Sequence, residues 1–262
     1  MARFVDLYTP SDTFLHRMDP RVKIIAVLML SLLALIMSKL VNLLALLTFI
    51  ALLLALGRAS PGKVYHALRF VVRVMVMIVV LWPLFDPSGT PVLAELGPVR
   101  ITEPAVWRGV TNAFRICCLA TVWYVLMFTT TQRDLVRALV KLGVRFDFGL
   151  TLSIALRFLP TFGANVDAIK DAQRARGMEF DKGSLIRRSK NYVAVLVPSI
   201  VAALRTADTL ALALQSRAYG VRKDRTYLRD LRMRTSDYVA LVLVVAALVL
   251  PATAKFLLKV QL

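Results

Sequence analysis

The sequence predicts an all-α integral membrane protein with about five transmembrane helices, one short helix and two long crossing amphipathic helices on the cytoplasmic side. Three observations support this prediction. Hydrophobic residues make up 58% of the 262 positions, which is too apolar for a soluble domain. The formal net charge is +18, and a basic membrane protein usually carries such an excess in cytoplasmic segments. The basic residues alternate with apolar helical faces and form no separate basic domain, so nucleic-acid binding is not expected.

The first region, residues 1–131, is predicted to hold four transmembrane helices. Its N-terminal stretch is polar and basic, and Asp19 before a proline is typical of an N-cap and first helical residue. Two apolar runs follow, 22–38 and 40–56, and the short polar turn between them predicts a helical hairpin. No apolar core precedes Lys23, so we expect no cleavable signal peptide.

Charge indicates which connections face the cytoplasm. Residues 57–73 contain Arg and Lys but no acid, which predicts a cytoplasmic loop. A third span should run from there to about Phe85, and residues 86–108, with several Pro and Gly, fit a non-cytoplasmic loop. The fourth span, about 110–131, contains Arg115. A charge within a span is a candidate functional residue, but the more ordinary interpretation is a side chain that reaches nearby headgroups.

Charged residues return in the second region, 132–236, which we expect to be cytoplasmic. Thr131 is a suitable N-cap for a short helix, and Gly143 is expected to end that helix. The third region, 237–262, contains the predicted fifth span from Tyr238 to Ala254.

The two cysteines, Cys117 and Cys118, are adjacent within an apolar run. This placement favours small buried hydrophobic side chains over a metal site. The two histidines, His16 and His66, are isolated, and no cofactor or metal is expected.

Two long amphipathic segments occupy most of the cytoplasmic region. Each has a wide apolar face and ends in an arginine flanked by small residues: Ala175-Arg176-Gly177 in the first and Ser216-Arg217-Ala218 in the second. Charges are too frequent for a comfortable span, so we expect these helices at the membrane interface or packed on each other beneath it. Small residues along the second helix would permit close crossing. Pro160 and Pro198 are expected to bend the helices.

The run from His16 to Lys23, the helical hairpin after it and the two arginine motifs resemble the transmembrane T-component of energy-coupling-factor (ECF) transporters, which are ATP-driven importers of vitamins and metal ions. The resemblance covers almost the whole chain. The family's hallmark is two Ala-Arg-Gly motifs at the ends of crossing cytoplasmic coupling helices. The first motif matches fully. The second keeps small residues around Arg217 but departs from the pattern at both flanks.

The resemblance implies a non-catalytic scaffold in the cell (plasma) membrane of a prokaryote. The implied partners are two ABC-type ATPase subunits, a substrate-binding membrane S-component and the lipid bilayer. Arg176 and Arg217 would dock into the ATPases, and ATP-driven closure of those subunits would shift the crossing helices. No Walker A pattern occurs in the sequence, so ATP hydrolysis is expected in partner subunits. The apolar residues expected to face the S-component are Leu150, Ile154, Phe158, Phe162, Leu196, Ile200 and Leu204.

Other interpretations stay open. Arg176 alone could be a solvated residue favoured by the dipole at a helix C-terminus, and the apolar faces could serve intramolecular packing only. A conventional ABC importer permease with its own substrate path would normally show several polar residues along its spans and one coupling helix. An intramembrane lipid-modifying enzyme would need an acidic or His cluster near the membrane.

Overall fold

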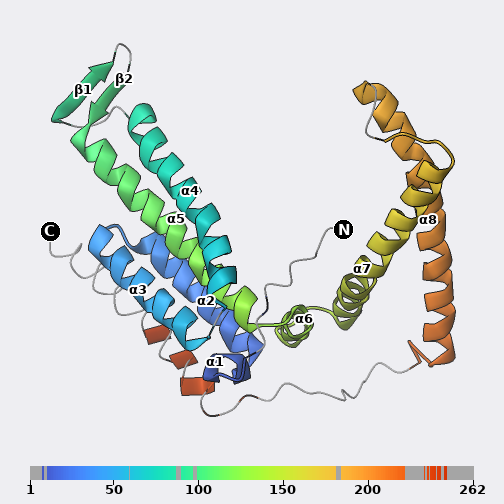
Figure 1. The fold of residues 1–262 in the computed structure, drawn as a ribbon. Helices are drawn as coiled ribbons and strands as arrows, with labels where there is room; N and C mark the ends of the chain where they lie inside the picture. Colours follow the sequence, from blue (N-terminus) through green and yellow to red (C-terminus); the bar gives the residue numbers. More distant parts are fainter. Residues whose placement is uncertain are drawn as a thin grey trace. The chain divides into compact units, whose positions relative to one another are not determined.

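The computed structural model describes residue 8, residues 11–58, 60–86, 90–96, 99–180 and 184–221, and some positions between 233 and 246. These residues form two compact units (Figure 1). The first contains the described residues up to Val144 together with those from Met233 onward, and the second contains those from Arg145 to Val221. The predicted fifth span, Tyr238 to Ala254, lies largely outside the described residues.

The first unit is built from helices and one small β-hairpin. In chain order it contains α1 (Phe14–Arg17), α2 (Pro20–Ile36), α3 (Leu40–Leu56), α4 (Pro61–Phe85), β1 (Val92–Leu96), β2 (Val99–Thr102), α5 (Glu103–Thr129) and α6 (Gln132–Lys141). Helix α3 has the predicted bounds. Helix α2 begins at Pro20, as the pair of Asp19 and proline predicted. Helix α5 begins earlier than predicted, because a proline in its first two positions starts the helix before the apolar run.

Helix α5 lies at the centre of this unit and contacts α2, α3 and α4. The burial of Cys117 and Cys118 confirms that they are small hydrophobic side chains in the packed interior. Apolar side chains of three helices form the buried cluster: Val27, Leu30, Leu33 and Ala34 from α2, Leu43, Leu46 and Ile50 from α3, and Cys118, Val122 and Leu126 from α5.

Small residues four positions apart let α5 approach α4 closely. Ala105, Gly109 and Ala113 are all buried. A Cβ atom at Gly109 would lie 3.2 Å from the Cβ of Trp82 and 3.5 Å from the Cδ of Pro83, so a larger residue would push the two helices apart. Lipid tails are as apolar as leucine, and close van der Waals contact of this kind is therefore a main source of helix association in a membrane.

Side chains and a glycine set several helix ends as predicted. The Asp19 carboxylate accepts a hydrogen bond from the backbone N–H of Arg21 (2.9 Å) at the start of α2. The Thr131 hydroxyl accepts one from the N–H of Asp134 (3.2 Å) at the start of α6. Helix α6 ends at Lys141, and Gly143 follows its C-cap residue with φ of +114°, a conformation that favours glycine. All three capping predictions are confirmed.

Two predicted loops were wrong. Residues 57–73 were expected to be a loop, but α4 begins at Pro61, and Arg69 and Arg73 lie on that helix. Proline suits the first helical turn because its missing N–H would have no intrahelical partner there. In residues 86–108, also expected to be a loop, β1 pairs with β2 in an antiparallel hairpin. Val, Ile and Thr in this stretch favour an extended backbone.

The second unit is a hairpin of two long helices, α7 (Phe146–Ala175) and α8 (Leu185–Ser216). Near one end, the side-chain amide of Gln173 donates to the carbonyl oxygen of Ala194 (3.3 Å). Near the other end, the Tyr219 hydroxyl donates to the Asp147 carboxylate (2.9 Å). The two helices therefore run antiparallel. Each helix continues through its internal proline.

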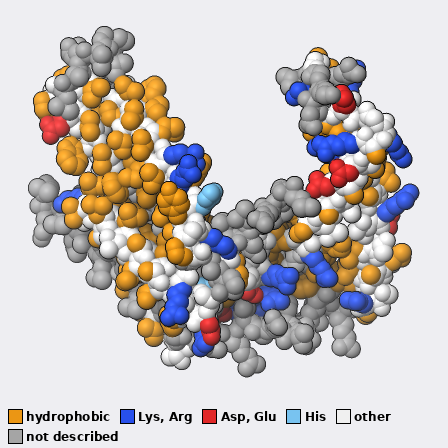
Figure 2. Space-filling model, in the orientation of Figure 1, with side chains coloured by type: hydrophobic (Ala, Val, Ile, Leu, Met, Phe, Trp, Pro, Cys, Tyr) orange, Lys and Arg blue, Asp and Glu red, His pale blue; other side chains and the backbone are white. Residues whose placement is uncertain are grey.

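Apolar side chains lie exposed on the outer faces of the helices, as expected of a membrane protein. Figure 2 shows hydrophobic side chains over most of the visible face around α4. Within the described residues, α4, α5 and the Arg188–Ser216 part of α8 are long and apolar enough to cross a membrane, and α3 is a shorter apolar helix. The prediction of an all-α integral membrane protein is confirmed, with one short β-hairpin added to it.

Candidate functional site

The first arginine motif forms the C-terminal cap of α7. Arg176 is the C-cap residue, and Gly177 follows in a left-handed conformation with φ of +86°. The N–H of Gly177 donates to the carbonyl of Arg174 (2.9 Å), and the N–H of Met178 donates to the carbonyl of Gln173 (3.0 Å). This pair of bonds defines a Schellman motif. Gly177 thus provides the left-handed end of α7 at a position that favours glycine.

The second motif forms the same cap at the end of α8. The N–H of Ala218 donates to the carbonyl of Gln215 (2.9 Å), and the N–H of Tyr219 donates to the carbonyl of Leu214 (3.0 Å). Arg217 therefore has the position at α8 that Arg176 has at α7. The left-handed residue here is Ala218, with φ of +56°. A side chain in this conformation costs about 1–2 kcal/mol that glycine avoids.

Both motif arginines are exposed at the ends of their helices. Within the described part of the chain, neither guanidinium group has a hydrogen bond or an ion pair. Arg174, only two residues before Arg176, differs: it pairs with Asp171 (3.4 Å) and lies 6.0 Å from the ring centre of Phe180. The two motif arginines are therefore the better candidates for contact with another molecule.

The two arginine ends lie far apart on the hairpin. Tyr219, two residues beyond Arg217, bonds to Asp147 at the start of α7, whereas Arg176 lies at the end of α7. A helix of 30 residues is roughly 45 Å long. The two guanidinium groups are thus separated by about the length of α7, which is too far for both to enter one pocket on one partner.

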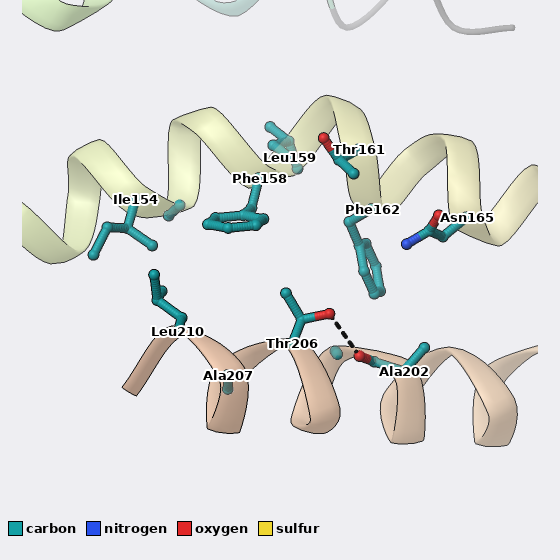
Figure 3. Close-up of a pocket in the computed structure, with 12 residues that line it drawn as sticks. Ile154, Phe158, Leu159, Thr161, Phe162, Asn165, Ala202, Thr206, Ala207 and Leu210 are labelled. Carbon is teal, nitrogen blue, oxygen red and sulfur yellow. Dashed lines mark hydrogen bonds between the residues drawn. The ribbon is translucent and has the colours of Figure 1, made fainter. Parts of the chain in front are cut away.

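An apolar pocket of about 330 Å³ lies between α7 and α8 (Figure 3). Phe158 and Phe162 of α7 point toward α8, and Ile154 faces Leu210 across the gap. The α8 side is lined mainly by small residues: Ala202, Ala203, Thr206, Ala207 and Leu210. Large side chains on one helix thus face small ones on the other. The hydroxyl of Thr206 donates to the carbonyl of Ala202 (2.8 Å) and is satisfied within its own helix.

The seven apolar residues singled out from the sequence fall into two groups. Ile154, Phe158 and Phe162 line the pocket, whereas Leu150 is half-buried outside its lining. The three on α8 lie outside the pocket and are largely exposed: Leu196, 57%; Ile200, 49%; and Leu204, 60%.

The N-terminal run contains a buried polar cluster that sequence reasoning missed. The ammonium group of Lys23, only 8% exposed, donates to the carbonyls of Thr129 (3.0 Å) and His16 (3.4 Å). The backbone N–H of Asp19 donates to the carboxylate of Asp237 (3.3 Å). Three segments distant in sequence are joined in this way. Lys23 lies at the start of an apolar run, which is the signal that could have indicated its role.

The apolar helices of the first unit, together with two long helices that each end in a capped, exposed arginine, define an all-α integral membrane protein. Comparison with known families makes this assignment specific. Residues 11–228 match the CbiQ family model, described as cobalt transport protein. The chain belongs to this family.

Individual relatives of the chain agree with the family match. The "Energy-coupling factor transporter transmembrane protein EcfT" of Heliobacterium modesticaldum is 34% identical over 256 residues, covering 93% of this chain and 94% of the relative. Its counterpart in Brevibacillus brevis is 32% identical over 252 residues, covering 93% of this chain and 95% of the relative. A Bifidobacterium longum protein named as an ABC transporter ATP-binding protein is 32% identical over 251 residues, which cover 92% of this chain but 32% of the relative. The resemblance to ECF transporter transmembrane components is thus confirmed.

Proposed function

We propose that this protein is the non-catalytic, energy-coupling subunit of an ECF-type ABC importer in the cell membrane of a prokaryote. It transmits motion from two ATPase subunits, through α7 and α8, to a separate substrate-binding S-component that takes up a vitamin or a metal ion. The observation that carries the proposal is the repeated cap: two antiparallel helices each present an exposed arginine from the same position of a Schellman motif.

Arginine is a suitable residue for binding a partner subunit that moves. Arginine keeps its charge at every physiological pH and pairs with a carboxylate through two parallel hydrogen bonds. The small residues around Arg176 and Arg217 let each helix end enter a groove. The separation of the two ends, about the length of α7, suits one contact on each of two ATPases.

The exposed apolar residues of α8 and the pocket beside them suit contact with another membrane subunit. Leu196, Ile200 and Leu204 are exposed, and exposed apolar patches of this kind mark interaction surfaces. Phe158 and Phe162 face small residues across an unfilled gap, so the two helices can slide or close without displacing a large side chain on α8. In this proposal, such movement shifts the S-component.

A relative supports the link to ATPases. The Bifidobacterium longum protein carries a segment similar to nearly all of this chain within a much longer polypeptide named as an ABC transporter ATP-binding protein.

Charge reversal at the motif arginines tests the proposal. The chain is co-expressed with the ATPase subunits and the S-component, and co-purification and ATP-driven uptake are measured for Arg176→Glu and Arg217→Glu. Each change should reduce recovery of the ATPases and abolish most uptake, since a guanidinium at the centre of an interface typically contributes about 2–4 kcal/mol.

Matched controls are Arg157→Glu and Arg205→Glu, which make the same change of charge on exposed faces in the interior of α7 and α8. Both controls should retain assembly with the ATPases. Normal assembly and uptake by Arg176→Glu and Arg217→Glu would reject the docking role.

A further inference from the structure

A polar recess of about 320 Å³ lies in the first unit, beside the turn that joins α2 to α3. It is lined by Ser38, Trp107, Arg108, Thr111, Asn112 and Arg115. None of these residues belongs to the paired helices α7 and α8, and the transport role proposed above uses none of them. Five of its six lining residues carry a polar or charged side chain other than tryptophan.

The guanidinium group of Arg115 caps the end of α2. Its Nε donates to the carbonyl of Ala34 (3.3 Å), and one terminal nitrogen donates to the carbonyl of Met37 (3.0 Å). The other terminal nitrogen donates to the side-chain oxygen of Asn112 (2.5 Å). The last carbonyls of a helix have no intrahelical donor, so this contact stabilises the end of α2.

The charge of Arg115 is not neutralised within the described residues. All three of its acceptors are neutral, and no described carboxylate pairs with it. A guanidinium has five N–H donors, so two are left to bind something else. By contrast, Arg108 in the same recess forms an ion pair with Asp86 (2.9 Å). The recess therefore presents one uncompensated positive charge, and a partly buried cation of this kind favours an anion beside it.

The level of the recess in the membrane indicates which anion it binds. The contacts of Arg115 place its guanidinium beside the last residues of α2, where α2 ends and Ser38 and Lys39 interrupt the two apolar runs. Trp107, 57% exposed at the rim of the recess, belongs to a residue type enriched at the membrane–water interface. Polar turns and interfacial tryptophans lie at the level of lipid headgroups, where phosphate diesters are the abundant anions.

We propose that this recess binds the phosphate group of an anionic phospholipid. The two remaining N–H groups of Arg115 donate to phosphate oxygens. The bound phosphate neutralises the guanidinium that caps α2 and so holds the α2–α3 turn against α5. Inorganic phosphate shares this chemistry, and the experiment separates the two sources.

The test uses the full-length protein, purified in a neutral detergent and depleted of lipid. Native mass spectrometry then follows separate titrations with phosphatidylglycerol, phosphatidylcholine of the same acyl chains, and inorganic phosphate. We expect one phosphatidylglycerol to bind at least about tenfold more tightly than phosphatidylcholine. Arg115→Gln should remove this preference. Arg69→Gln, an exposed arginine on α4 outside the recess, should keep it.

A second variant guards against misfolding of Arg115→Gln. Thr111→Phe leaves the guanidinium and its carbonyl contacts in place but fills the recess, and it should also lose the tight lipid. Arg115-dependent binding of inorganic phosphate without tight lipid would support the phosphate site and assign it to free phosphate. Equal binding of the two lipids, or a preference for phosphatidylglycerol that survives in both recess variants, would overturn the proposal.

Discussion

The ends of α7 and α8 have the same cap but different residues at its left-handed position. At Gly177 the conformation is free of side-chain strain, and a Cβ atom there would meet nothing within 4 Å. At Ala218 the same conformation carries a cost of about 1–2 kcal/mol. The cap geometry is thus kept although the second motif departs from Ala-Arg-Gly at both flanks. The placement of the arginine, rather than the identity of its neighbours, is what the two ends share.

The two ends also differ in how the hairpin holds them. Several contacts support the end of α7: Gln173 bonds to α8, and Lys170 lies 5.6 Å from the ring centre of Phe180 and 5.5 Å from that of Tyr192. The end of α8 is tied to α7 by the bond from Tyr219 to Asp147. Tyr219 thus links the α8 end to the start of α7, and the contribution of this hydrogen bond can be tested.

The largest expected effect is loss of affinity for the ATPases. Arg176→Ala and Arg217→Ala should each weaken binding of purified ATPase by about 2–4 kcal/mol, or roughly 30- to 700-fold. If the two arginines contribute equally to ATPase binding, the two losses of affinity should agree within about tenfold. Titration calorimetry with one ATPase at a time would measure them. A large loss at one arginine and none at the other would show that the shared geometry does not mean a shared role.

A smaller effect is expected from substitution of Gly177, the glycine of the first motif. Gly177→Ala should destabilise the end of α7 by about 1–2 kcal/mol, because alanine would have to adopt a φ near +86°. Faster hydrogen exchange at the Met178 amide would report this loss. Gly163→Ala, inside the same helix where nothing lies within 4 Å of the new Cβ, should instead stabilise α7 by roughly 0.5–1 kcal/mol. The two substitutions should therefore change stability in opposite directions. Unchanged exchange in Gly177→Ala would contradict the strain argument.

Replacing Ala218 with glycine should stabilise the C-terminal end of α8. Ala218→Gly relieves the left-handed strain but adds backbone entropy to the unfolded chain, leaving a net gain of about 0.5–1 kcal/mol. Slower exchange of the Tyr219 amide, which bonds to Leu214, would report the gain. Ala213→Gly, within α8, should have the opposite effect. Destabilisation by both glycines would mean that Ala218 is not strained.

The smallest effect concerns the tie between the two helices. Tyr219→Phe removes the hydrogen bond to Asp147 and should cost about 0.5–1 kcal/mol, at the low end for a hydrogen bond because the pair is exposed. The α8 end should become more mobile while the α7 end stays unchanged, as spin labels placed after each motif would show. An equal increase in the mobility of both spin labels would show that this hydrogen bond does not act on the α8 end alone.

Local signals predicted much of the fold. The caps at Asp19, Thr131 and Gly143, and the bounds of α3, follow from residues within one or two turns of each helix end. The early start of α4 and the β-hairpin were missed, because the charge pattern and the Pro and Gly content of those stretches suggested loops. Of the candidate site, the sequence indicated the two arginines and the pocket side chains of α7, but not the opposing face of α8.

The sequence by itself determined the membrane class, the helical composition and the position of each arginine at a helix end, because hydropathy and helix termination are encoded by neighbouring residues. Only the tertiary structure decided that Phe158 and Phe162 face the alanines of α8, and that Arg115 caps a helix that ends about 80 residues earlier in the chain. These arrangements depend on contacts between residues distant in sequence. No local pattern specifies such contacts, because several helix rotations bury similar apolar area and packing chooses among them.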